Sequence, residues 1–138
     1  MTRRRGNTSQ RRPLVLLVED EVGTQDALAT LLRMDGWDVD CAYDGEEALD
    51  CMAARVPDVI VTDYMMPNMD GLAMIRHIKE DPELAAIPIV LMSAASLKAD
   101  WRGKVEAFLP KPIDLSELRK VMATLVRRAW EDDGSDGD

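Results

Sequence analysis

The chain has few residues of the kinds that form disulfides or ligate soft metals. Of its 138 residues only two are cysteines, Cys41 and Cys51, and one is a histidine, His77. The cysteine spacing fits neither a disulfide framework nor a CxxC metal site, so we expect two small buried apolar side chains in a reducing compartment. His77 falls on the polar side of a helical pattern, which favours a surface position over the role of ligand or phosphodonor.

Long apolar runs and excess positive charge are also missing. No apolar run approaches the roughly 18 residues of a membrane-spanning helix, and the arginine-rich start is not followed by a signal-peptide core. The chain has 17 basic and 26 acidic side chains and a net charge of −9. Nucleic-acid binding depends on neutralising phosphates with Lys and Arg. We therefore expect a cytoplasmic protein with no membrane insertion and no nucleic-acid partner.

The length predicts one domain between two tails. Residues 1–12 include five arginines and no apolar residue after Met1, so we expect a disordered basic N-terminal tail. Residues 131–138 (EDDGSDGD) are acidic and glycine-rich, which predicts a disordered acidic C-terminal tail. Residues 13–130 would form the folded domain. Neither end resembles a folded output module.

Between the tails, strand-like and helix-like periodicities alternate. The apolar runs Leu14–Val18, 59–62 and 89–92 are typical of strands covered on both faces, and 37–43 is a further predicted strand. Predicted helices span about 22–34, 71–80 and 115–129, and another runs from an Asp44 cap to before Pro57. This alternation predicts an α/β fold with a doubly wound parallel sheet.

Reactive side chains follow the apolar runs. Glu19 and Asp20 follow the first run, Asp63 the second and Ser93 the third, and Lys111 precedes a proline near the end of the domain. Ligands of parallel α/β sheets bind at the carboxyl edge, where these groups would meet in one crevice. Acid groups, a hydroxyl and an ammonium together predict a site for Mg²⁺ and a phosphoryl group.

Five segments of the sequence resemble those of a known family. They are LVLLVEDE, CAYDGEEAL, PDVIVTDYMMPNMDGL, IPIVLMSA and FLPKPI, within roughly residues 13–129. On these segments the chain resembles the receiver domains of bacterial two-component response regulators, including single-domain chemotaxis regulators. The resemblance implies a flavodoxin-like five-stranded sheet of order 2-1-3-4-5.

The resemblance also implies roles for the acidic residues. Asp63 matches the phosphoacceptor, which receives its phosphoryl group from a sensor histidine kinase or a histidine phosphotransfer protein. Asp20 matches a direct Mg²⁺ ligand, Glu19 one that usually acts through water, and Met65 a residue that ligates through its backbone carbonyl. Asp63 would complete the metal site.

Three further residues match the phosphoryl-binding and switch positions of the family. Lys111 would contact the phosphoryl group, with a cis peptide bond to Pro112, and Ser93 would supply the switch hydroxyl. Phe108 matches the switch aromatic, although it lacks the hydroxyl found in many members. Ser93 as a cap and Phe108 as a merely buried side chain remain as alternatives.

One stretch departs from the family. The segment between Ser93 and Lys111 is shorter by about one helical turn. This short length predicts a shortened fourth helix at about residues 97–102. In the family this region helps to form the face that binds output partners, and whether residues 94–106 still do so stays open.

These patterns lead to one functional hypothesis with two rivals. We expect a stand-alone receiver that acts on an unknown downstream protein. It would catalyse only its own aspartyl phosphorylation and dephosphorylation, and would not otherwise be an enzyme. The first rival is a receiver fold used as a docking module without phosphorylation. The second is a small phosphatase with an acidic site. Such an enzyme would need a second acid two residues after Asp63, and this chain has Met65 there.

Overall fold

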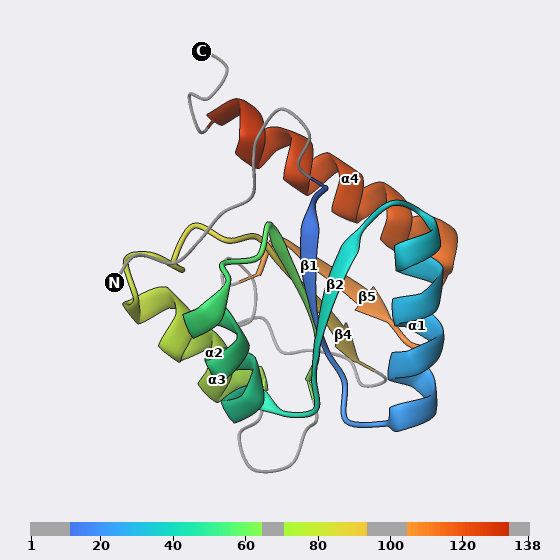
Figure 1. Ribbon diagram of the computed structural model, residues 1–138, viewed down its shortest axis with the longest axis horizontal. Helices are drawn as coiled ribbons and strands as arrows, with labels where there is room; N and C mark the ends of the chain where they lie inside the picture. Colours follow the sequence, from blue (N-terminus) through green and yellow to red (C-terminus); the bar gives the residue numbers. More distant parts are fainter. Residues whose placement is uncertain (1–11, 65–70, 94–104, 133–138) are drawn as a thin grey trace.

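The computed structural model describes residues 12–64, 71–93 and 105–132 of the chain. Its strands and helices alternate along most of the sequence (Figure 1). In chain order they are β1 (Leu14–Val18), α1 (Val22–Met34), β2 (Asp38–Ala42), α2 (Gly45–Ala54), β3 (Val59–Asp63), α3 (Gly71–Glu80), β4 (Ile89–Ser93), β5 (Ala107–Pro110) and α4 (Leu115–Asp132). All strand pairs are parallel, in the order β2-β1-β3-β4-β5. The predicted sheet and strand order are confirmed.

Helices cover both faces of the sheet, which explains the unbroken apolar runs. Figure 1 shows α1 and α4 on one side of the strands and α2 and α3 on the other. Along β1, Val15 and Leu17 pack in the core of the α1 and α4 side, whereas Leu16 and Val18 pack on the α2 and α3 side. Because successive side chains point to opposite faces, a strand buried on both sides is apolar at every position.

Side-chain caps and a glycine mark the ends of the helices. The Asp44 carboxylate accepts a hydrogen bond from the Glu47 amide (2.8 Å), and the Glu47 carboxylate accepts one from the Tyr43 amide (2.6 Å). Both bonds satisfy donors at the helix start, as in a capping box. After α1, Gly36 has a φ of +101°, the left-handed region that glycine enters without steric cost.

The bounds of α4 and β2 differ from those predicted. Helix α4 continues to Asp132, three residues beyond the predicted end, so Glu131 and Asp132 belong to it rather than to a tail. Strand β2 is one residue shorter at each end than predicted. The helix predicted at 97–102 and the tail segments 1–11 and 133–138 lie outside the described residues. Among the residues described, no helix combines the length and apolar character needed to cross a membrane.

A buried carboxylate holds the last helix to the start of the sheet. Asp58, which is 7% exposed, accepts a hydrogen bond from the Leu14 amide (2.8 Å) through one oxygen. Its other oxygen accepts one from the Trp130 indole (2.9 Å). The last turns of α4 are therefore fixed against the first residue of β1, which accounts for the greater length of this helix.

Replacing Asp58 with alanine should destabilise the fold. The change removes the acceptor of two donors and leaves the buried Leu14 amide without that bond, at a cost of about 2–3 kcal/mol. Urea unfolding measures the change, with the exposed α2 residue Asp50 as a matched control that should shift stability by less than about 0.5 kcal/mol when changed to alanine. Equal stability of the two variants would contradict the role given to Asp58.

Candidate functional site

The carboxyl ends of the strands bring the predicted site residues to one edge of the sheet. Glu19 and Asp20 directly follow β1, Asp63 ends β3 and Ser93 ends β4. Lys111 follows β5, and its amide donates a hydrogen bond to the Ser93 carbonyl (2.9 Å). All five therefore occupy the same end of the parallel sheet, where α/β folds bind their ligands.

Three carboxylates gather at this edge. Glu19, Asp20 and Asp63 each contribute an oxygen, and these oxygens lie within 4.8 Å of one another. Glu19 is 1% and Asp63 6% exposed, whereas Asp20 faces solvent. The buried Oε1 atom of Glu19 has no hydrogen-bond partner among the described residues. Clustered hard oxygen donors with an unsatisfied buried oxygen fit a divalent cation of the Mg²⁺ type.

The ammonium group of Lys111 approaches the carboxylates. Lys111 Nζ lies 2.7 Å from Asp63 Oδ2, where it donates a hydrogen bond, and 3.6 Å from Glu19 Oε1. The peptide bond between Lys111 and Pro112 is cis, as the resemblance implied. The lysine therefore links two of the acids directly.

The proton affinities in the site reflect crowding of negative charge. Burial raises the pKa of Glu19, and the neighbouring charges of Asp63 and Asp20 raise it further, against a lowering by the Glu21 amide and Lys111. Burial tends to lower the pKa of Lys111, but its hydrogen bond to Asp63 and the charges of Asp63 and Glu19 outweigh burial, and the net shift is upward. The fold thus holds a destabilised carboxylate beside a stabilised ammonium.

A buried glutamine that the sequence interpretation missed positions the acidic loop. Gln25 is 2% exposed, and its side-chain amide donates to the backbone carbonyls of Glu19 (3.0 Å) and Ala42 (2.9 Å). These bonds fix the chain after β1 against the end of β2. The available signal was a polar side chain on the same helical stripe as Leu28 and Leu32, where an apolar residue is the norm.

Gly71 lets α3 start against the backbone of the site. Its amide donates to the Tyr64 carbonyl (3.0 Å). A Cβ atom at this position would lie 3.2 Å from the Asp63 carbonyl oxygen and 3.2 Å from two Tyr64 backbone atoms. Such contacts require a shift of backbone, so a glycine here keeps α3 close to Asp63 without moving it.

The other predicted site residues are Ser93, Phe108 and Met65. Ser93 is buried, with 2% exposure, at the end of β4. Phe108 on β5 is 38% exposed, so the alternative of a merely buried Phe108 is wrong. On β5, the edge strand of the sheet, Leu109 is buried whereas Phe108 and Pro110 are exposed, since successive side chains point to opposite faces. Met65 lies outside the described residues.

Residues 15–123 match the family model of the response regulator receiver domain. The chain belongs to this family. As a receiver domain it is a protein of phosphorylation-based signalling rather than a metabolic enzyme. It is 35% identical over 125 residues to the response regulator MprA of Mycolicibacterium vanbaalenii, covering 88% of this chain and 53% of that protein. Against MprA of Mycobacterium bovis the identity is 33% over 126 residues, with 88% and 54% covered. The chain spans about half the length of these curated relatives.

Solved structures show the same fold. A sensor protein from Polaromonas sp. JS666 superposes with a TM-score of 0.80 at 27% identity, covering 86% of this chain and 98% of that one. The receiver domain of the sensor histidine kinase PA1611 from Pseudomonas aeruginosa PAO1 has a TM-score of 0.76 at 26% identity, covering 84% and 98%. That receiver domain was solved with a magnesium ion coordinated in its active-site cleft.

Changing Glu19 to glutamine should stabilise the receiver domain in cation-free buffer at neutral pH. A raised folded-state pKa means that the folded protein binds the proton more tightly than the unfolded chain does. The stability contributed by this group is therefore complete below the ordinary value of 4.5 and is lost as pH rises through the raised value. Thermal unfolding between pH 4 and pH 8 should show the wild type falling behind the variant as pH increases. Parallel curves would contradict this assignment.

Proposed function

We propose that this receiver domain is a phosphorylation-operated switch in which Asp63 accepts a phosphoryl group from a phosphohistidine. The donor would be a sensor histidine kinase or a histidine phosphotransfer protein. The observation that carries the proposal is the 2.7 Å contact between Lys111 Nζ and Asp63 Oδ2 inside the carboxylate cluster. A nucleophilic carboxylate beside an ammonium is the arrangement that phosphoryl transfer to aspartate requires.

The reaction can be written with the residues present. An oxygen of Asp63 forms a bond to phosphorus while the bond between phosphorus and the donor imidazole nitrogen breaks. The electron pair of that bond returns to the imidazole, which takes up a proton, and the product is an acyl phosphate on Asp63. Lys111, already beside this carboxylate, then holds a phosphoryl oxygen through its ammonium. When water attacks the phosphorus, the bond between phosphorus and the Asp63 oxygen breaks, inorganic phosphate leaves and the carboxylate is restored.

We assign a Mg²⁺ site to Glu19, Asp20 and Asp63, with Met65 as a backbone ligand. Bound Mg²⁺ would screen the negative charges that keep the carboxylate and the phosphoryl group apart. The oxygen cluster and the buried Glu19 Oε1, which accepts no hydrogen bond from the described residues, support this assignment. So does the ion coordinated in the related PA1611 receiver domain.

The proposed output is a change in the surface around β4 and β5. Ser93 ends β4 and is paired with Pro110 at the end of β5, two residues after the exposed Phe108. A hydroxyl drawn toward a phosphoryl group at Asp63 would bias the ring of Phe108 toward a second position. A separate downstream protein in the cytoplasm would then read that surface.

A docking module that is never phosphorylated is the main alternative. The crowded carboxylates argue against it. Three acids within reach of one another, two of them buried, oppose folding through burial and mutual repulsion. A docking surface gains nothing from this arrangement, whereas a site for a cation and a phosphoryl group needs it.

Asp63→Asn should abolish phosphorylation. With Mg²⁺ and phosphoramidate, whose phosphorus–nitrogen bond resembles that of phosphohistidine, the wild type should gain one phosphoryl group, measured by intact mass. Chelation of Mg²⁺ should give the same loss as the substitution. The exposed Asp50 changed to asparagine is the matched control and should be labelled like the wild type. Full labelling of the Asp63 variant would rule out this acceptor.

Lys111→Ala and Ser93→Ala should affect different steps. Loss of the ammonium removes charge stabilisation where the phosphoryl group arrives, so phosphorylation should slow by about 100-fold. Ser93→Ala should be phosphorylated but should not move Phe108. Because Phe108 is the only phenylalanine, NMR of ring-labelled phenylalanine reports this side chain alone.

The exposed Ser116 changed to alanine is the control for the second step and should retain the phosphorylation-dependent change in the Phe108 signal. The same change in Ser93→Ala would show that Ser93 is not the switch hydroxyl.

A further inference from the structure

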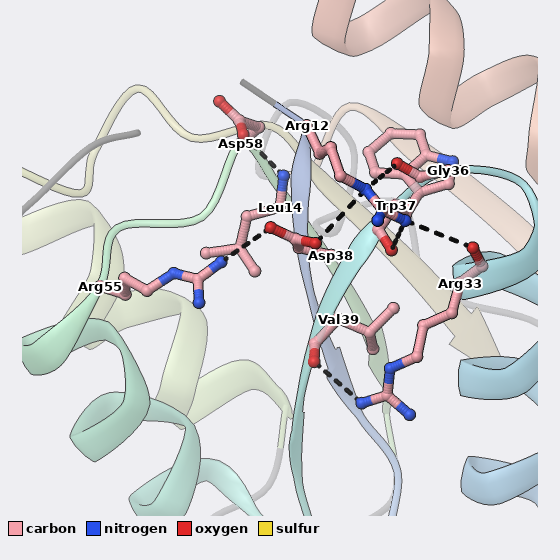
Figure 2. A network of polar contacts seen from close by, with 9 residues as sticks. All are labelled: Arg12, Leu14, Arg33, Gly36, Trp37, Asp38, Val39, Arg55 and Asp58. Atoms are coloured by element: carbon pink, nitrogen blue, oxygen red, sulfur yellow. Dashed lines mark hydrogen bonds and ion pairs between the residues drawn. The ribbon is translucent and has the colours of Figure 1, made fainter. Parts of the chain in front are cut away.

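A second polar site lies at the opposite end of the sheet from the carboxylate cluster. A cavity of about 460 Å³ opens beside the start of β2, lined by Arg12, Arg33, Trp37, Asp38, Val39 and Arg55. Asp38 begins β2 and is paired with Leu14, the first residue of β1. The candidate phosphorylation site follows the other ends of the strands, so this cavity, here called the arginine pocket, is separate from it. Figure 2 shows the residues of the arginine pocket.

The arginine pocket is positively charged in a negatively charged protein. Three guanidinium groups and one carboxylate give its lining a formal charge of +2, whereas the whole chain carries −9. Concentrating positive charge at a concave site attracts anions and repels cations. A volume of this size lies within the range of about 300–1,000 Å³ found for small-molecule sites and is larger than a single phosphate ion needs.

The backbone holds two of the arginines in place. Arg12 donates from Nε to the Gly36 carbonyl (3.0 Å) and from Nη2 to the Trp37 carbonyl (3.3 Å). Arg33 donates from Nη2 to the Val39 carbonyl (3.1 Å). Arg12 Nη2 also donates to the Arg33 carbonyl (3.4 Å). A guanidinium has five N–H donors in a fixed fork, so these bonds orient each group. Among the described residues they leave the Nη1 group of Arg12 as its donor for a ligand.

Asp38 is a weak partner for the arginines that flank it. Figure 2 shows its carboxylate between Arg12 and Arg55, and both ion pairs measure 3.5 Å. Charge-assisted hydrogen bonds of this type are usually about 2.7–2.9 Å long. All three side chains are about half exposed, at 53%, 46% and 45%, so the pairs are screened and add little stability.

From this arrangement we infer that the arginine pocket binds a small phosphate ester. The phosphate would take the place of the single loose carboxylate between Arg12 and Arg55, with more oxygens and more charge to satisfy the free donors. Trp37, 8% exposed, gives the pocket an apolar wall for the organic part of the ligand. The site would make the receiver domain responsive to a metabolite independently of Asp63.

Titration of the full chain with ADP, inorganic phosphate and adenosine tests the inference. The buffer contains a chelator, because divalent cations would recruit phosphate to the carboxylate cluster. The chain has three tryptophans, so its indole N–H groups give three NMR signals, and a Trp37→Phe variant assigns the relevant one. ADP should shift the Trp37 signal saturably and adenosine should not, whereas inorganic phosphate should bind more weakly than ADP.

Two substitutions should move the affinity in opposite directions. Arg55→Gln removes one charge-assisted donor and should weaken ADP binding by about tenfold. Asp38→Asn removes the competing carboxylate and should tighten binding, a gain that a misfolded variant cannot produce. Arg76→Gln, an exposed arginine on α3 outside the pocket, is the control and should bind like the wild type.

Several results would overturn the inference. They are the absence of saturation in both the wild type and Asp38→Asn, equal binding of adenosine and ADP, or equal weakening by Arg76→Gln and Arg55→Gln. The inference would also be overturned if the wild type did not bind ADP but a variant with Asp133, Asp136 and Asp138 changed to asparagine did. In that case the acidic end of the chain, not a phosphate ester, is the natural occupant.

Discussion

Repulsion among three carboxylates at one edge of the sheet is balanced by the ammonium of Lys111, and the site depends on that balance. Glu19 and Asp63 are buried, and Lys111 reaches both. The parallel sheet imposes this crowding, because every strand delivers its last residue to the same edge. Gln25 and Gly71 then hold the backbone on either side, the first after β1 and the second after β3. The fold thus tolerates a locally unfavourable arrangement of charge, which a cation or a phosphoryl group can relieve.

The sequence was most informative where burial on both faces left no choice of residue. Strands β1, β3 and β4 are buried at all five positions, so their apolar runs predicted these strands and thereby located the reactive side chains at their ends. Edge strands gave a weaker signal, and the predicted bounds of β2 were too wide by one residue at each end. The end of α4 was set too early because the bond from Trp130 to Asp58 joins residues far apart in the chain.

Positioning contacts were the part of the site that could not be predicted. Gln25 acts through the backbone carbonyls of Glu19, which follows β1, and of Ala42 in β2, and no residue type at those carbonyls reveals the bond. The arginine pocket was even harder to predict from the sequence, since Arg12, Arg33 and Arg55 come from three separate segments. Sequence patterns describe one element at a time, whereas these groups meet only through the register of β1 with β2. The sequence left Phe108 open between the switch aromatic and a merely buried side chain, and its 38% exposure excludes only the second.

The carboxylate of Asp58 has a consequence for how this domain can be joined to other proteins. Because one side chain binds both the first residue of β1 and the indole near the end of α4, the entry and exit of the folded region lie at a common point. That point is at the end of the sheet away from Asp63. A linker or a fluorescent label at either end therefore leaves the phosphorylation edge clear. A short peptide that connects the two ends, with new termini opened in a loop elsewhere, gives a circular permutant that this topology accommodates.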